Sequence, residues 1–275
     1  MSTIRLIALL ASLSGLLMIV GYFIAKRKGV VIALIISVIM NFGSYWYSDK
    51  IVLSMYAAQP VTKSQAPVLY EAIESLSAKA GIPIPKVYVI PNASPNAFAT
   101  GRNEEHAAVA LTSGILKILN KDELEAVIAH ELSHIKHKDI LIGTMAATIV
   151  SAVVLLSRWS MFFGSGDDSG MIKTIAVAII APVAATLIQM AISRSREYEA
   201  DEGSARVSGK PEALAGALTK LSRSAAARPM DANPATAHMF IVNPLSGGTI
   251  MNLFSTHPPP EKRIERLLKM GGQTR

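Results

Sequence analysis

Two histidines and a glutamate lie close together in the sequence HELSH, residues 130–134. On a helix His130 and His134 are one turn apart, so both imidazole rings can point at one metal ion. Zn²⁺ suits two neutral imidazoles and one carboxylate, with a water molecule in the open fourth position. Glu131 is turned about 100° around the axis from His130, so it can reach that water rather than the metal. The motif predicts a zinc site in which Glu131 is the general base for hydrolysis of a peptide bond.

The third protein ligand is not expected on the same helix. His137 lies on nearly the same face as His130, but about 10 Å further along the axis, which is too far for one tetrahedral ion. We therefore predict that His137 is exposed or faces the lipid headgroups. A third histidine six residues after His134, as in some zinc proteases, is excluded because that position is Ile140.

A cluster of acidic residues follows much later, in the segment AISRSREYEADEGSA, residues 191–205. Glu197 and Asp201 are four residues apart and share one helix face, whereas Glu199 points away. One of the pair could bind zinc while the other holds a ligand histidine in place. The spacing alone also fits an ordinary charged helix face beside two arginines.

Four apolar runs approach or reach the roughly 20 residues needed to cross a bilayer core. They cover residues 6–25, 30–48, 140–163 and 174–192. The mean hydropathy is +0.37, and only 17% of the residues are charged, which is unusual for a soluble domain. A signal peptide is a weaker reading of the first run, because its apolar core is too long and no cleavage site follows.

These runs explain how distant ligands could meet. The HELSH helix is expected to run directly into the third apolar run, and the fourth run leads directly to Glu197. The metal should therefore lie within about 10–15 Å of the apolar boundary. The predicted organisation is a membrane hairpin at 1–49, a first catalytic part at 50–139, a second membrane hairpin at 140–193, and a second catalytic part at 194–275.

The predicted fold is α+β and mainly α-helical, with a small β-sheet in the catalytic part. A helix is expected from Pro67 to Gly81, and a strand over Lys86–Ile90. NAFATG and HAAVALT should form a β-hairpin or an edge pair. Asp122 and Glu125 have the spacing of a capping box at the start of the HELSH helix. Further helices are predicted near residues 211–226 and on PPEKRIERLLKM.

The chain carries a net charge of +7, but we do not predict a nucleic-acid partner. The basic residues gather at the ends of the apolar runs and in the last helix, without interleaved aromatic residues, so anionic lipid headgroups are the better partners. Near the ends of the runs, seven Lys and Arg residues lie on the side of the catalytic parts and five on the other. This count favours a catalytic domain in the cytoplasm. The absence of cysteine excludes disulfide scaffolds and cysteine-based zinc sites.

Four motifs, HELSH, REYEAD, THPPPEKRIERL and NAFATG, together resemble the HtpX family of integral-membrane zinc metalloproteases. These are gluzincins, related to the type I CaaX prenyl proteases. The resemblance implies a zincin-like catalytic domain and four transmembrane helices. It also implies one Zn²⁺ per chain, with Glu197 as the third ligand and Asp201 as the partner that holds a ligand histidine. His257 and Arg263 resemble groups that stabilise the transition state in related proteases.

NAFATG resembles the family's edge strand that lines the cleft. An exposed edge can bind an extended substrate by strand addition, with Asn96 and Ala97 contributing backbone contacts. The other interpretation is a turn asparagine at the start of an ordinary strand.

The resemblance implies endoproteolysis of misfolded or damaged membrane proteins, as quality control in a stress response at the cell inner membrane. The expected partners are polypeptide substrates and the lipid bilayer, and a homo-oligomer is left open. Two alternatives remain: maturation of one specific peptide or lipidated precursor, and a non-catalytic scaffold in which zinc clamps two membrane spans. Cleavage of prenylated peptides is not favoured, since the CaaX proteases are larger and have more spans. The scaffold is not favoured either, because structural zinc uses four protein ligands and only three are found.

Overall fold

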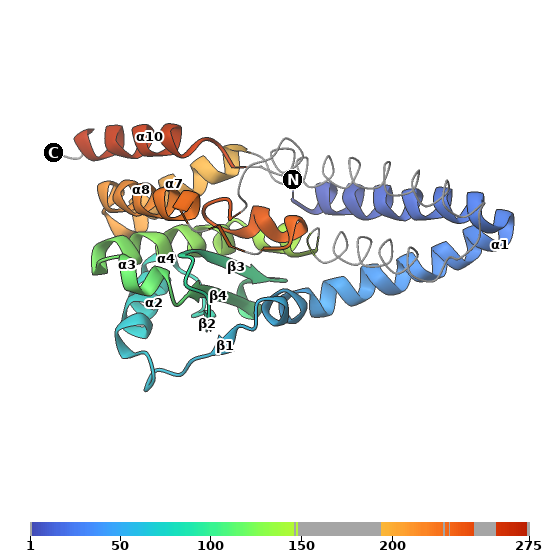
Figure 1. The fold of residues 1–275 in the computed structure, drawn as a ribbon, viewed down its shortest axis with the longest axis horizontal. Helices are drawn as coiled ribbons and strands as arrows, with labels where there is room; N and C mark the ends of the chain where they lie inside the picture. Colours follow the sequence, from blue (N-terminus) through green and yellow to red (C-terminus); the bar gives the residue numbers. More distant parts are fainter. Residues whose placement is uncertain are drawn as a thin grey trace.

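The described residues of the computed structural model are 2–145, 147, 194–227, 229–230, 232–244 and 257–273. The fold is α+β and mostly helical, as predicted, with one small mixed sheet. Helices and sheet pack together at one end of the molecule, and the long helix α1 (Ser2–Met55) extends away from them (Figure 1).

Helix α1 folds back on itself to form a hairpin. Lys26 leaves helical geometry with φ 52°, at the junction between the first two apolar runs. Gly21 and Gly29 lie so close that a Cβ atom on Gly29 would be 1.8 Å from the carbonyl oxygen of Gly21. Only glycine allows this approach of the two halves. Further along, Asn41 Nδ2 donates a hydrogen bond to Ser14 Oγ at 3.1 Å.

Among the described residues, one helix is long and apolar enough to cross a membrane. This helix is Ala25–Met55, and the mean hydropathy of an 18-residue window within it is 1.8. It contains the predicted second span. Its apolar side chains are widely exposed, for example Ile39 at 65% and Phe42 at 66%, which suits contact with lipid. The predicted first span is helical, with Leu10–Ile19 as its apolar stretch. The predicted third and fourth spans lie almost entirely outside the described residues, so the total of four spans and the segment boundaries stay predictions.

Four short strands form the sheet in the order β1-β2-β4-β3. Their bounds are Gln59–Pro60 for β1, Lys86–Ile90 for β2, Ala97–Gly101 for β3 and Ala107–Thr112 for β4. β2 runs parallel to β4, whereas β1 and β3 are antiparallel to their neighbours. The predicted strand and hairpin are therefore confirmed, and β3 forms one edge of the sheet.

Helix α4 (Lys121–Lys136) lies at the centre of the catalytic part and carries HELSH. It packs against β3 and against helices α2 (Pro67–Ala80), α7 (Arg194–Ser208) and α8 (Pro211–Ala227). The remaining described elements are α3 (Ile115–Ile118), α10 (Pro260–Gln273) and the 3₁₀ helices η1 (Glu104–His106) and η2 (Pro234–Met239). Ile128, Leu132 and Ile135 are fully buried along the core-facing side of α4. This burial fixes the helix and the orientation of its polar residues.

The start of α4 differs from the prediction. Asn120 Oδ1 accepts the N–H of Glu123 at 2.9 Å, and the Glu123 carboxylate accepts the N–H of Asn120 at 2.9 Å, which makes the capping box. Asp122 and Glu125, predicted for this role, instead accept hydrogen bonds from Lys210 Nζ at 2.5 and 2.7 Å. Both pairs have a spacing that suits a capping box, so the sequence pattern alone did not separate them.

The end of α4 also differs. The helix stops at Lys136, and helical residues resume at 139 and continue to 145. Between them Lys138 adopts the left-handed conformation with φ 60°. The prediction that the HELSH helix runs directly onward is therefore wrong, and the chain bends just before the third apolar run.

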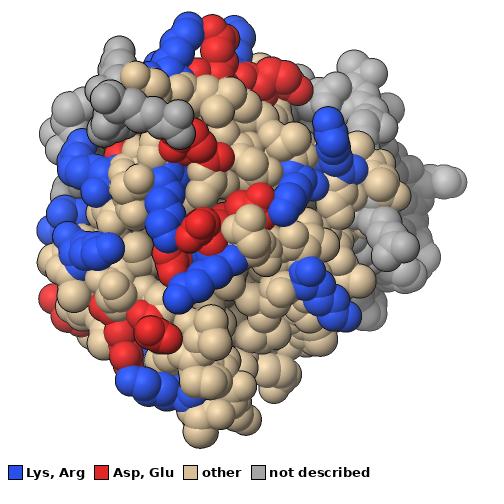
Figure 2. Space-filling view, turned by 90° about the vertical axis from the view of Figure 1, so that its left-hand side faces the viewer, with Lys and Arg blue, Asp and Glu red and all other residues tan. Residues whose placement is uncertain are grey.

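The face of the catalytic part that is turned away from α1 carries basic and acidic side chains interspersed (Figure 2). Such mixing differs from the basic stripe by which nucleic-acid-binding proteins attract phosphates.

Candidate metal centre

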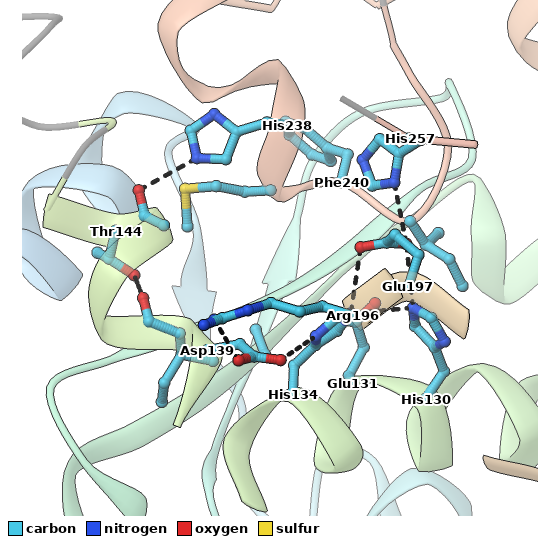
Figure 3. Close-up of a pocket in the computed structure, with 15 residues that line it drawn as sticks. His130, Glu131, His134, Asp139, Thr144, Arg196, Glu197, His238, Phe240 and His257 are labelled. Atoms are coloured by element: carbon cyan, nitrogen blue, oxygen red, sulfur yellow. Dashed lines mark hydrogen bonds and ion pairs between the residues drawn. The ribbon is translucent and has the colours of Figure 1, made fainter. Parts of the chain in front are cut away.

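Helices α4 and α7 bring three predicted ligands together (Figure 3). His130 Nε2 lies 3.2 Å from His134 Nε2. Glu197 Oε1 lies 3.5 Å from His134 Nε2, and Glu197 Oε2 lies 3.8 Å from His130 Nε2. Donor atoms around one tetrahedral zinc ion, with bonds of about 2.0–2.1 Å, are about 3.3 Å apart. The spacing and the chemistry of the three donors therefore fit a single zinc ion.

The electrostatics of the three donors also suit a cation. Burial lowers the pKa of His130 to about 4, although Asp201 opposes the shift, so this ring is neutral at pH 7. Burial raises the pKa of Glu197, but the nearby His257, His134 and Arg263 together outweigh burial and hold that pKa well below the usual value. Burial lowers the pKa of His134, but the hydrogen bond to Asp139 and the charge of Glu197 raise it to about 9 overall. Binding of a metal ion would release the proton of His134 and replace its positive charge.

Asp201 and Arg263 lie behind His130. Asp201 Oδ1 is 3.0 Å from His130 Nδ1. Arg263 donates to Asp201 through Nε at 2.9 Å and through a terminal nitrogen at 2.7 Å, forming a two-point contact. Its other terminal nitrogen is 3.4 Å from Glu197 Oε2. Arg263 is 2% exposed, so its charge is neutralised by these two carboxylates rather than by water.

Glu131 and His257 lie on the pocket beside these donors. Burial raises the pKa of the Glu131 carboxyl to about 7, and the charge of His134 and, more weakly, a hydrogen bond from the backbone of Ala99 oppose the shift. A carboxyl group with a pKa near 7 can both accept and return a proton at neutral pH. His257 Nδ1 lies 2.9 Å from Glu197 Oε2, which places this ring next to the predicted third ligand.

Asn96 and Ala97, the predicted substrate-binding residues, already have partners within the chain. Asn96 Nδ2 donates to the carbonyl of Val242 at 2.8 Å. The carbonyl of Ala97 accepts the N–H of Ile241 at 3.0 Å. The chain's own segment 241–242 therefore occupies the carbonyl of Ala97, one of the backbone groups that were expected to bind substrate, and the side chain of Asn96. Ala99, two residues further along β3, faces the same outer edge of the strand and lines the pocket.

Three ionisable residues that line this pocket were not predicted from the sequence: Asp139, Arg196 and His238. Asp139 and Arg196 pair with each other next to His134. His238 Nε2 lies 3.1 Å from the carbonyl oxygen of Gly143. The sequence carried no periodic signal for His238, since η2 lies in a polar stretch without a pattern. His137 is exposed, as predicted.

The sequence is similar to known proteases over most of its length. The model of peptidase family M48 matches residues 63–271. A protease HtpX homolog of Pyrococcus furiosus is 56% identical over 270 residues, covering 95% of this chain and 93% of the relative. A protease HtpX homolog of Paraburkholderia phytofirmans is 54% identical over 269 residues, covering 95% of this chain and 94% of the relative.

A solved structure resembles the fold at low sequence identity. The crystal structure of S. mikatae Ste24p aligns with a TM-score of 0.51 and 18% identity. The alignment covers 85% of this chain and 57% of the Ste24p chain. At this identity the likeness concerns the fold alone.

Proposed function

The chain belongs to peptidase family M48 and is a membrane metalloendopeptidase of the HtpX type. On this basis we propose that it degrades misfolded or damaged membrane proteins, and that one zinc ion per chain takes part in the cleavage. One observation carries the proposal. The donor atoms of His130, His134 and Glu197 all lie within 4.8 Å of one another, beside a buried Glu131.

In the proposed mechanism, His130, His134 and Glu197 would hold a zinc ion, which when bound would supply a Lewis acid for the activation of water and the polarisation of a carbonyl group. Glu131 takes the proton of the attacking water and returns it to the leaving amine, a task suited to its pKa of about 7. Asp201 fixes the ring of His130 by facing its Nδ1 atom.

His257 and Arg263 are proposed to stabilise the negative charge that develops on the substrate carbonyl oxygen. The ring of His257 lines the pocket and can donate from its edge. Arg263 is held in place by Asp201, so its positive charge acts from a fixed position. Such preorganised charge needs no rearrangement when the oxyanion forms.

We propose that an extended substrate adds to the outer edge of β3. Ala99 borders the pocket on this edge. Contacts to Asn96 and Ala97 require that residues 241–242 first give up their hydrogen bonds to these groups.

A single cysteine at position 242 would report this release. The chain has no cysteine of its own, and Val242 is 7% exposed. In a Glu131→Gln background, Val242→Cys should react slowly with a thiol reagent and faster once an unfolded substrate is bound. The matched control is Ala217→Cys on α8, a fully buried position that should stay slow under both conditions. Bound substrate without faster labelling would show that the substrate pairs at Ala99 and leaves segment 241–242 in place.

The pocket favours broad specificity over maturation of one precursor. Ile140, Met239, Phe240 and Ile241 contribute apolar side chains to its wall. An apolar wall that includes a methionine makes few specific demands on the side chain that it contacts. We therefore expect many scattered cleavage sites when an unfolded membrane protein is digested and its products are sequenced. The same digestion with the Glu131→Gln variant is the negative control. One dominant cleavage site would favour a dedicated maturation protease instead.

The catalytic parts 50–139 and 194–275 are proposed to face the cytoplasm, with membrane hairpins at 1–49 and 140–193. The count of basic residues near the apolar runs supports this orientation. The close packing of α4 against α7 supports a second hairpin that returns the chain to the same side.

A further inference from the structure

We infer that Asp139, held by Arg196, is a positioning residue that orients the ring of His134 for metal binding. The inference rests on the proposed zinc site. Asp139 Oδ2 lies 3.3 Å from His134 Nδ1. The other oxygen of Asp139 accepts a hydrogen bond from Arg196 (Figure 3). When Nδ1 carries the proton and donates to Asp139, Nε2 presents its lone pair toward His130 and Glu197.

The backbone is bent in a way that makes this contact. In an uninterrupted helix residue 139 would be rotated about 140° from His134 and displaced about 7.5 Å along the axis, out of reach of its ring. The break at residues 137–138 brings Asp139 back over His134. It places Lys138 at φ 60°, in the left-handed region, where a residue with a Cβ atom is strained. Backbone strain of this kind persists where the surrounding structure requires it.

The same arrangement occurs behind the other histidine. His130 Nδ1 faces Asp201, and Asp201 is held by Arg263. Each histidine therefore has an aspartate behind it, and each aspartate is fixed by an arginine. The two aspartate–arginine pairs differ in burial. The side chains of Asp139 and Arg196 are both 12% exposed, whereas those of Asp201 and Arg263 are 3% and 2% exposed.

The pair also connects two distant parts of the chain. Asp139 and Arg196 are 57 residues apart and flank the predicted second membrane hairpin. Moving the two ends of this segment apart would separate Arg196 from Asp139 and remove the group that fixes Asp139 beside His134. The geometry of the metal site is thereby coupled to the spacing of these ends.

Zinc affinity of the purified full-length protein, measured by competition with a chelator, tests the inference. Asp139→Ala should weaken zinc binding about 10- to 100-fold, as loss of the partner of a ligand histidine commonly does. Arg196→Gln should weaken it by a smaller factor. The double variant should bind no more weakly than Asp139→Ala, because Arg196 acts through Asp139. Asp139→Asn should recover part of the affinity, since its amide oxygen can still accept from Nδ1.

The matched control is Arg194→Gln, which removes an exposed arginine from the same turn of α7 and should leave zinc binding unchanged. The absorption spectrum of the cobalt-substituted protein gives a second readout, and it should shift in Arg196→Gln but not in Arg194→Gln. Equal zinc affinity and equal cobalt spectra in the parent, Arg196→Gln and Asp139→Asn would overturn the inference while leaving the zinc site intact. Additive losses from Asp139→Ala and Arg196→Gln would also overturn it. A parent that binds no zinc would overturn the proposed function itself.

Discussion

Glu131→Gln is expected to lower kcat for peptide cleavage by about 100- to 10,000-fold, the range that a general base contributes. The amide has nearly the same shape as the carboxylate but cannot take a proton from water. Because Glu131 is not one of the three converging donors, the zinc content should stay at the parent level. Cleavage rates and metal analysis of the same zinc-loaded samples check both parts.

Glu125→Gln is the matched control for this variant. Glu125 lies on the same helix and binds Lys210 at the side of α4, away from the pocket. Its substitution should leave kcat unchanged. Cleavage by Glu131→Gln at the parent rate would show that another group is the base. Loss of zinc together with activity would show that Glu131 acts by maintaining the site.

Arg263→Leu is expected to cost about 3–5 kcal/mol of unfolding free energy, the range for removal of one partner of a buried ion pair. The substitution leaves Asp201 uncompensated, with its side chain 3% exposed, and removes a positive charge near Glu197. Arg263→Lys should cost less, because an ammonium group keeps the charge but loses the two-point contact. Denaturant unfolding of the detergent-purified, metal-free protein measures both.

Arg266→Leu provides the comparison on the same helix. Arg266 pairs with Glu202 at 3.0 Å, but both side chains are more than 40% exposed. An exposed pair contributes about 1 kcal/mol or less. Similar losses for the substitutions at 263 and 266 would show that burial does not give the Asp201–Arg263 pair its importance.

Local patterns were sufficient for much of the fold and for the two histidines of the candidate metal site. The HELSH spacing placed His130 and His134 on one helix face, and the family resemblance selected Glu197 from several acidic residues. The helix over Pro67–Ala80 was predictable because a proline begins it and Gly81 ends it at φ 72°, where glycine is favoured. The spacing of residues on a helix face and the residues that begin or end a helix depend only on neighbours in the sequence.

The remainder depends on contacts that such patterns do not contain. The contact of Asp139 with His134 arises only because the helix breaks at Lys138, and neither glycine nor proline marks that break. The pairing of residues 241–242 with Asn96 and Ala97 joins segments about 145 residues apart, as the separation of 146 between Asn96 and Val242 shows. No periodicity predicts such a backbone contact, which is why the edge of β3 was expected to be free.

Measurement of the metal content tests directly whether Glu197 is the third ligand of a catalytic zinc ion. The detergent-purified parent and Glu197→Gln would be analysed for bound zinc, and casein cleavage would be followed in both. The account predicts about one zinc per chain and cleavage in the parent, as one catalytic site requires, and loss of both in Glu197→Gln. Zinc retained by Glu197→Gln would contradict the assignment of this residue as the third ligand. Zinc bound by a parent that cleaves nothing would contradict the catalytic account and favour a structural metal.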